Sequence, residues 1–528
     1  MGLAMTAIGR SAAADDGGPP VARKHTLLMV DDRDILYRAG TERVFVPARK
    51  HDASPVVSEE HVWEKAIGWT SVSRNPETGI YQLWYQAYAG RGHHPKTHDC
   101  VVCYAESPDG IQFSKPKLGL HSFNDIADTN IVLIGNGGYG DRYGNAVIVD
   151  PREPDPAKRY KMAYYDWSVR DGREFAGLHL AFSPDGVRWT KHPGLVYPTA
   201  YGARGMQPPR DGEETYFESP GKNDTVRKRW VLPNTMSDAA DVMFDPVRKC
   251  FAIYGKLWID GPDGSMGWKH AMGRVESADL LHWTKPRVVC FPDEFDLSVA
   301  EFHTSPVFWH SGRFYCLNQI LDRRKDIGGI DIELMVSHDG LDWERPFRDG
   351  RFLARGEPGS FDSGSLFTNA TPVVLGDEMR FYYGAYGSTA IGGGEAIEGP
   401  RQRSGVGLAI LPRDRFAGLR SVPVSDQPTL KNPLQDTGQV TLKPLDFTGC
   451  TDIVINADAA GGEVRCELLT EDGYRVPGFE KENGAPLKKD AIRFRLSWKD
   501  RKIAELPPAS YCLRIHLKKA TLYAVTFR

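Results

Sequence analysis

The sequence predicts an all-β protein: a five-bladed β-propeller at residues 25–420, followed by a C-terminal β-sandwich at residues 436–528. Three observations lead to this prediction. A hairpin phrase with Ser, Asp and an aromatic residue recurs along the chain, and a second, more aromatic hairpin precedes each copy. The last part of the chain alternates apolar and polar side chains, as strands with one buried face do.

The recurring phrase has the form Ser-x-Asp-Gly-x-x-Trp. Asp-Gly between two strand-like runs is a strong hairpin signal, because the turn needs a positive φ that Gly adopts readily. The aromatic residue that follows can pack on a neighbouring sheet. Four clear copies and a degenerate fifth occupy residues 107–113, 183–189, 277–283, 337–343 and 405–416.

The preceding hairpin consists of a strand, a turn and an aromatic strand. Its copies occupy residues 69–85, 146–165, 242–254, 306–315 and 372–383. Two hairpins make a four-stranded sheet, and a series of five such sheets is typical of a five-bladed propeller.

The two ends of the chain lack the repeated hairpins. Residues 1–24 are expected to be a disordered tail or the remnant of an export signal, since Ala12–Ala14 resembles the small-residue end of a signal peptide. This favours a periplasmic or secreted protein and leaves a cytoplasmic one open. A proline-containing linker at residues 421–435 precedes the strand-like segments of the predicted sandwich, which are 451–456, 463–469, 492–498, 511–517 and 520–527.

The composition of the chain and the motifs that it lacks disfavour several classes of function. Lys plus Arg is 66 and Asp plus Glu is 69, giving a net charge of −3, which disfavours a nucleic-acid partner. No run of about 18 apolar residues is present, so no membrane span is expected. The sequence carries no phosphate-binding loop, nucleophile elbow, zinc-protease or dinucleotide motif, so we expect neither a cofactor nor a metal. The oligomeric state is left open.

Candidate site residues lie just ahead of the first strand of each predicted blade, where a propeller's channel opens. Several predicted blades carry an acid there, and a ring of carboxylates suits glycosidic cleavage, which needs an acid and a base or nucleophile. Any one of these acids can equally be a strand cap or a solvated turn. The expected catalytic residues are Glu64, Asp141, Asp238 and Glu301, and the expected substrate-binding residues are Trp63, Arg142, Tyr143, Asp241, His303 and Asp362.

Roles follow from the neighbours of each acid. Glu301 is expected to be the general acid, because Phe302 and His303 beside it provide a partly desolvated setting. Asp238 or Glu64 is then the nucleophile or base. Asp141, next to an arginine, stays charged and holds sugar hydroxyls.

The repeated hairpin, the Asp-Pro turns at residues 150–151 and 245–246, and the appended sandwich resemble the five-bladed propeller glycoside hydrolases. The chain looks most like family 32, the fructofuranosidases, with the family 43 arabinosidases and xylosidases next. Where family 32 has its nucleophile, stabiliser and acid motifs, this sequence has Glu64, Gly140-Asp141-Arg142, and Asp238 with Asp241.

The resemblance implies a glycoside hydrolase acting on a carbohydrate, such as a furanoside or an unusual sugar of an oligo- or polysaccharide. Two alternatives stay open: a non-catalytic carbohydrate-binding propeller, and a propeller phosphorylase or transglycosylase. For the phosphorylase, the expected phosphate ligands are Arg142, His303, Arg323 and Arg324.

Overall fold

The computed structural model shows an all-β chain. It describes residues 25–90, 92–138, 145–170, 173–198, 215–220, 226–231, 236, 238, 240–259, 261–264, 268–324, 328–367, 371–387, 403–422 and 437–528. The predicted tail and most of the predicted linker lie outside these residues. Within them, the helices are the short 3-10 turns η1 (Lys96–His98), η2 (Pro156–Lys158) and η5 (Ile503–Glu505). No helix in this part of the chain is long and apolar enough to cross a membrane.

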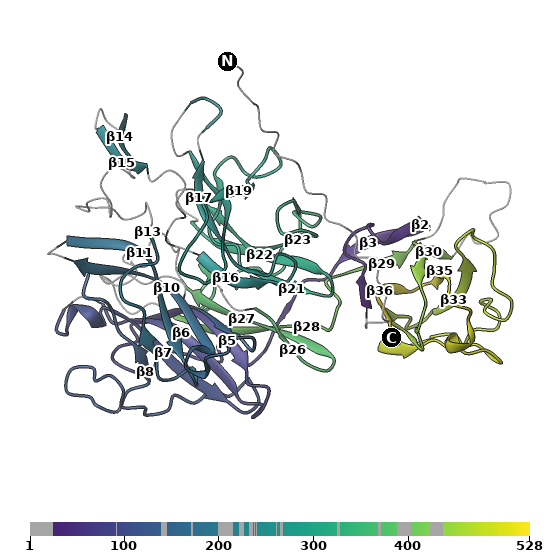
Figure 1. The fold of residues 1–528 in the computed structure, drawn as a ribbon, viewed down its shortest axis with the longest axis horizontal. Helices are drawn as coiled ribbons and strands as arrows, with labels where there is room; N and C mark the ends of the chain where they lie inside the picture. The colour runs from purple at the N-terminus through teal and green to yellow at the C-terminus, as the bar shows by residue number, and fades with distance from the viewer. Residues whose placement is uncertain are drawn as a thin grey trace, which may run out of the picture. The chain divides into compact units, whose positions relative to one another are not determined.

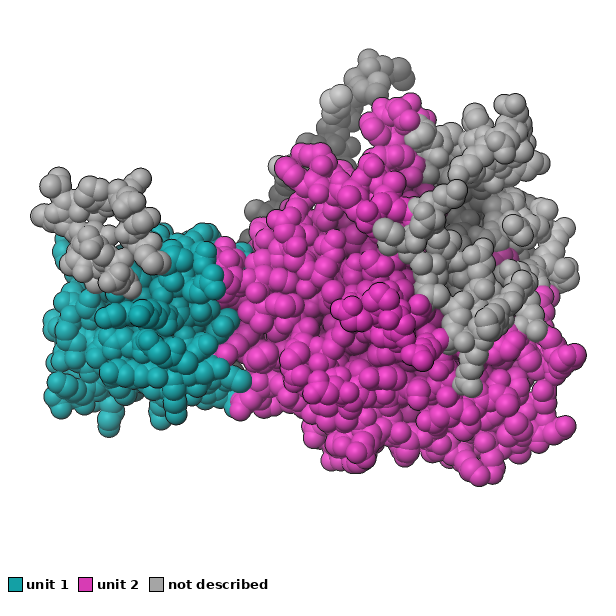
Figure 2. Space-filling model, turned by 180° about the vertical axis from the view of Figure 1, so that it is seen from behind, with its two compact units in different colours: residues 1–42, 419–528 teal, residues 43–418 magenta. Residues whose placement is uncertain are grey.

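The chain divides into two compact units (Figures 1 and 2). One comprises residues 43–418, and the other combines the residues up to 42 with residues 419–528. The sequence analysis places residues 25–42 with the propeller. In the structure, β1 (His25–Leu28) pairs with the last strand, β36 (Thr521–Phe527), and β2 (Ile35–Ala39) pairs with β30 (Gly438–Leu442).

In the larger unit, the first three sequence repeats each form an antiparallel sheet. Repeat one contains β5 (Ala66–Arg74), β6 (Tyr81–Tyr88), β7 (Cys100–Ser107) and β8 (Ile131–Leu133). Repeat two contains β9 (Ala146–Val149), β10 (Tyr160–Arg170), β11 (Arg173–Ser183), β12 (Thr190–Lys191) and β13 (Tyr197–Pro198). Repeat three contains β16 (Ala240–Asp245), β17 (Cys250–Ile259), β18 (Lys269–Ser277) and β19 (Arg287–Cys290). A separate hairpin joins β14 (Thr215–Pro220) to β15 (Val226–Val231).

Repeats four and five share one ten-stranded sheet. Repeat four contributes β20 (Ala300–Phe302), β21 (Val307–His310), β22 (Arg313–Asp322), β23 (Ile330–Ser337) and β24 (Trp343–Glu344). Repeat five contributes β25 (Ser365–Phe367), β26 (Val373–Val374), β27 (Glu378–Tyr386) and β28 (Ser404–Pro412). A single parallel pair, Ile330 with Ser365, joins the two repeats. The early strand β4 (Arg49–Lys50) pairs with β28.

Each hairpin turn is stabilised by hydrogen bonds between its own residues. In the first copy, Ser107 donates its hydroxyl to Asp109 Oδ1 (2.8 Å), and the same oxygen accepts the backbone N–H groups of Ile111 and Gln112. Gly110 N donates to Ser107 Oγ (2.9 Å). These backbone hydrogen bonds hold the pKa of Asp109 below its ordinary value. The copies at 183, 277 and 337 make the same Ser–Asp contacts, so this turn is specified locally.

Each such turn also meets the preceding repeat. Trp84 Nε1 donates to the Gly186 carbonyl (2.6 Å), and a Cβ added to Gly186 would lie 2.6 Å from the Trp84 ring. Tyr254 donates to the Gly340 carbonyl in the same way (2.9 Å). In the third copy the turn residue is Leu280 (φ 67°), which packs in one hydrophobic cluster with Ala163. Ala163 occupies the strand position of Trp84, and its small side chain leaves room for the leucine.

The first and last repeats make the same contact. Tyr382, on β27, donates to the Gly110 carbonyl (2.7 Å). The first strands of the repeats also share one cavity of about 350 Å³, lined by residues of β5, β9, β16, β21 and the segment 371–374.

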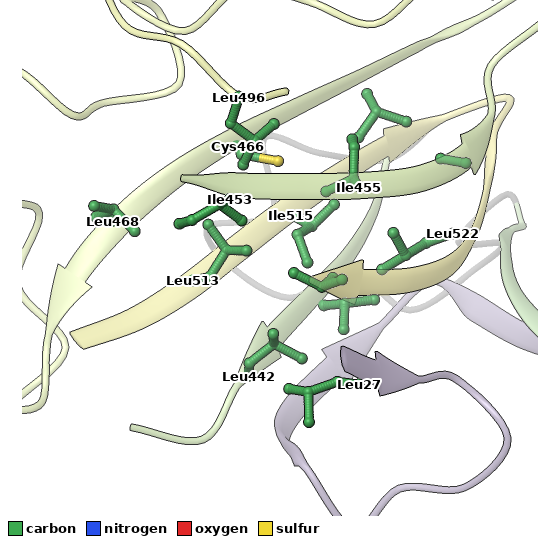
Figure 3. Packing of buried hydrophobic residues seen from close by; sticks show 14 of the residues in the cluster. Leu27, Leu442, Ile453, Ile455, Cys466, Leu468, Leu496, Leu513, Ile515 and Leu522 are labelled. Atoms are coloured by element: carbon green, nitrogen blue, oxygen red, sulfur yellow. The ribbon is translucent and has the colours of Figure 1, made fainter. Parts of the chain in front are cut away.

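The smaller unit contains two sheets. The first is built from β1, β3 (Thr41–Phe45), β29 (Ala417–Ser421), β32 (Ile453–Asp458), β34 (Asp490–Arg495) and β36. The second is built from β2, β30, β31 (Leu445–Asp446), β33 (Glu463–Thr470) and β35 (Ser510–Lys518). Alternate residues of both sheets meet in one hydrophobic cluster (Figure 3), including Leu27, Ile455 and Leu522 from the first and Leu468 and Ile515 from the second.

Candidate active site

Glu301, on β20, is one of the predicted acids and is 6% exposed. Its Oε2 atom lies 2.6 Å from His270 Nδ1 and 2.8 Å from Arg323 Nε. Among the described residues, none donates a hydrogen bond to the other oxygen, Oε1. The carboxylate is therefore held by one oxygen and keeps the other available.

Glu301 belongs to a cluster of charged and imidazole side chains from repeats three and four, which we call the Glu301 cluster. Lys256, on β17, contacts Asp238 Oδ1 at 2.7 Å and His303 Nε2 at 3.5 Å. Asp238, Lys256 and His270 are almost fully buried, while the Arg323 side chain is 41% exposed. The cluster consists of Asp238, Lys256, His270, Glu301, His303 and Arg323.

The electrostatics of the cluster favour an ionised Glu301. Burial acts to raise the pKa of Glu301, but the hydrogen bond from His270 and the charge of Arg323 outweigh it and hold that pKa below its ordinary value. Burial lowers the pKa of His270 to about 4, with a further contribution from Lys256. Burial and Lys256 likewise hold the pKa of His303 well below its usual range. An ionised Glu301 suits a base or nucleophile better than the general acid that the sequence suggested.

Aromatic side chains from other repeats flank the cluster at His303. The ring centroid of His303 lies 5.8 Å from that of Trp69 and 5.4 Å from that of Phe367. Trp69 has a positive φ of 38° at an irregularity in the pairing of β5 with β6. Residues of repeats one, four and five therefore meet around this histidine.

Glu64, a second predicted acid, lies in a different environment. It is fully buried, and its oxygens accept hydrogen bonds from Tyr85 Oη (2.5 Å), Lys115 Nζ (2.8 Å) and the backbone N–H groups of Glu60 and His61. Trp63 beside it is 2% exposed and sits in the hydrophobic core of repeat one. The structure thus does not bring Trp63 and Glu64 into the Glu301 cluster, and a core tryptophan offers no open face for a sugar.

Asp362 is also engaged by neighbouring side chains. Its Oδ2 accepts from Lys50 Nζ (2.5 Å) and Tyr383 Oη (3.0 Å), and its Oδ1 accepts from Ser360 Oγ (2.8 Å). Because the aspartate is 3% exposed, these contacts favour a structural role.

Asp241, on β16, is buried and has no hydrogen-bond partner for either carboxyl oxygen among the described residues. Burial raises its pKa well above the ordinary value, although the backbone N–H groups of Val307 and Val242 face the carboxyl. Ser71 occupies the same strand position in repeat one and accepts a hydrogen bond from Val147 N of the next repeat (3.1 Å). Asp241 therefore lies at a junction between repeats.

The predicted residues Asp141, Arg142 and Tyr143 lie outside the described residues. The sequence analysis missed Lys256 and His270, which join the cluster from the end of β17 and the start of β18. Neither residue belongs to the segments ahead of first strands, from which the predicted site residues come. In an antiparallel sheet, the end of the second strand and the start of the third lie beside the start of the first strand, as the pairing of Trp258 with His270 illustrates. The expected antiparallel register could therefore have pointed to Lys256 and His270.

In the described ranges, no group of three or more His, Cys, Asp or Glu side chains is arranged to hold a metal ion.

Comparisons with known proteins give structural similarity only. No family model and no curated protein matches the sequence. A solved glycoside hydrolase is 11% identical, with 74% of this chain and 96% of that chain covered and a TM-score of 0.43. A structure from the GH130 family of mannoside phosphorylases, described as containing hydrolases that target β-1,2 mannosidic linkages in Candida mannan, is 17% identical (coverage 70% and 95%, TM-score 0.42).

A thermostable family-43 glycoside hydrolase is 15% identical, with 69% of this chain and 96% of that chain covered and a TM-score of 0.41. At TM-scores below 0.5, these similarities carry no functional assignment. The function proposed below rests on the side chains themselves.

Proposed function

We propose that the protein is a carbohydrate-active enzyme that cleaves a glycosidic bond, with Glu301 as its ionised carboxylate. The observation that carries the proposal is the state of Glu301: one oxygen is fixed by His270 and Arg323, and the other accepts from no described residue. Glycosidic cleavage needs a carboxylate that attacks the sugar or activates water. Glu301 takes that role here.

The second carboxylate of the reaction is assigned to Asp238 or Asp141. Asp238 shares the Glu301 cluster through Lys256. The substrate class we propose is an oligo- or polysaccharide containing a furanoside or another unusual sugar, in keeping with the resemblance of the repeated hairpin to the propeller glycoside hydrolases. His303 supplies a polar group of the kind that binds sugar hydroxyls, and the buried rings of Trp69 and Phe367 pack beside it.

The architecture we propose for this enzyme is a closed ring of five blades carrying a β-sandwich. The contact of each hairpin turn with the preceding repeat supports it, because the Tyr382–Gly110 bond extends the same contact from the last repeat to the first. The cavity lined by all the first strands supports it as well. The sandwich is supported by the hydrophobic cluster shared between the two sheets of the smaller unit.

A phosphorolytic reaction is the second candidate, and the cations of the cluster favour it. Lys256 and Arg323 place two positive charges beside Glu301 and His303. A phosphate would need such partners to replace water as the attacking group. Arg324, considered for the same role, is paired with Asp322, as Lys256 is with Asp238 and Arg323 with Glu301.

The test is a screen of oligo- and polysaccharides with wild type and Glu301→Gln, with and without inorganic phosphate, following products and anomers by NMR. We expect wild type to release sugar and the variant to lose about 100- to 10,000-fold in kcat/KM while remaining folded. Sugar phosphate formed only with phosphate present identifies phosphorolysis. If wild type binds a carbohydrate without turning it over, the protein is a non-catalytic carbohydrate-binding module and the proposed enzymatic function is wrong.

A further inference from the structure

His270 makes a single polar contact with the Glu301 cluster. Its Nδ1 atom lies 2.6 Å from Glu301 Oε2, and the residue is 2% exposed. Because an ionised carboxylate only accepts hydrogen bonds, Nδ1 must carry the proton. Nε2 then bears a lone pair, and among the described residues it has no hydrogen-bond partner.

The ring of His270 is fixed by packing as well. Its centroid lies 3.8 Å from that of Trp258, the residue paired with it across β17 and β18. An imidazole held on one side by an indole and on the other by a carboxylate has little freedom to turn. The direction of its N–H therefore determines where Glu301 Oε2 lies.

The two partners of Glu301 contribute differently. The pKa of His270, lowered to about 4 by burial, leaves this ring uncharged at neutral pH, so it supplies a directed hydrogen bond. Arg323 supplies the positive charge from a side chain that is 41% exposed. The other titratable groups near the pair are Lys256, His303 and Asp238.

We propose that His270 is the positioning residue of the site: it fixes Glu301 Oε2 through Nδ1–H and so directs the unengaged Oε1 atom at the substrate. This proposal rests on the proposed function. It assigns to a histidine of the third repeat a role that acts only through Glu301, since its own Nε2 atom is buried.

The test uses the geometry of amide side chains. The Asn amide nitrogen can occupy the place of histidine Nδ1, whereas the Gln amide reaches only toward Nε2. We expect His270→Gln to lower kcat about 10- to 100-fold with little change in KM, and His270→Asn to restore kcat to within about tenfold of wild type. In His270→Gln the acid limb of the pH–rate profile should move to higher pH, because Glu301 loses a hydrogen bond that favours its ionised form.

A second measurement does not depend on activity. The pKa of Glu301 can be followed by infrared difference spectroscopy against Glu301→Gln. This pKa should be higher in His270→Gln than in wild type, and it should stay near the wild-type value in His270→Asn. Equal kcat and equal ionisation in both histidine variants, with Glu301→Gln inactive, would overturn the positioning role and leave the proposed function standing. An active Glu301→Gln enzyme would instead overturn the proposed function.

Discussion

Glu64 and Glu301 have the same kind of place in the sequence and opposite surroundings in the structure. Both lie at the start of a repeat, and both are buried. Glu64 accepts hydrogen bonds from a lysine, a tyrosine and two backbone N–H groups. Glu301 has two partners on one oxygen, one of them a half-exposed arginine. A fully satisfied carboxylate stabilises its own surroundings, whereas a partly satisfied one keeps an oxygen for chemistry.

The largest expected contrast is in stability when each carboxylate is removed. Glu64→Ala leaves the buried Lys115 with only the exposed Glu60 carboxylate, at 3.6 Å, so we expect a loss of about 3–5 kcal/mol in the free energy of unfolding. Glu301→Ala should lose only about 1 kcal/mol, because Arg323 can turn to water and His270 is neutral. Urea unfolding followed by fluorescence measures both. Similar losses in the two variants would contradict the distinction between them.

Replacing the cationic partner of each glutamate should give a smaller difference in stability between the two sites. Lys115→Met removes a charged hydrogen bond from a buried carboxylate and should cost about 1.5–3 kcal/mol. Arg323→Met, at a more exposed pair, should cost less than about 1 kcal/mol.

The Arg323 variant should instead change the pH dependence of the reaction. The charge of Arg323 lowers the pKa of Glu301, so its loss raises that pKa and moves the acid limb of the kcat/KM profile to higher pH. An unmoved profile, measured on the substrate found in the screen, would argue against Glu301 as the group that must be ionised.

Asp241 provides a comparison in which stability depends on pH. Burial raises its pKa, so the folded protein binds this proton more tightly than the unfolded chain does. Its stabilising contribution is complete below the unfolded pKa of about 3.9 and is lost as the pH rises toward the folded pKa. Asp241→Asn does not titrate. We expect it to gain stability relative to wild type as the pH rises from about 4 toward the raised folded pKa, by about 1.4 kcal/mol for each pH unit crossed.

The matched control is Asp362→Asn, which removes the charge opposite Lys50 and should lose stability rather than gain it. Chemical denaturation at several pH values measures both variants. Parallel stability curves for wild type and Asp241→Asn would mean that this carboxyl ionises as freely in the folded protein as in the unfolded chain.

The sequence by itself determined the elements that depend on neighbours along the chain. The Ser-x-Asp-Gly turns form because Ser107 and Asp109 bind backbone N–H groups within the same turn, and the equivalent residues do so in the later copies. The all-β character followed from these turns and from the alternation of side chains. Asp238, Glu301 and His303 lie in one cluster because residues ahead of first strands gather at one end of the repeats.

Only the tertiary structure decided what each buried side chain does. Glu64 meets Lys115, 51 residues away, and Glu301 meets His270, 31 residues away, so the partners that satisfy one acid and leave the other open are invisible locally. Leu280 is tolerated at a glycine position because Ala163 of the preceding repeat is small. Burial and pairing depend on contacts between repeats, and these contacts form only when the sheets pack together.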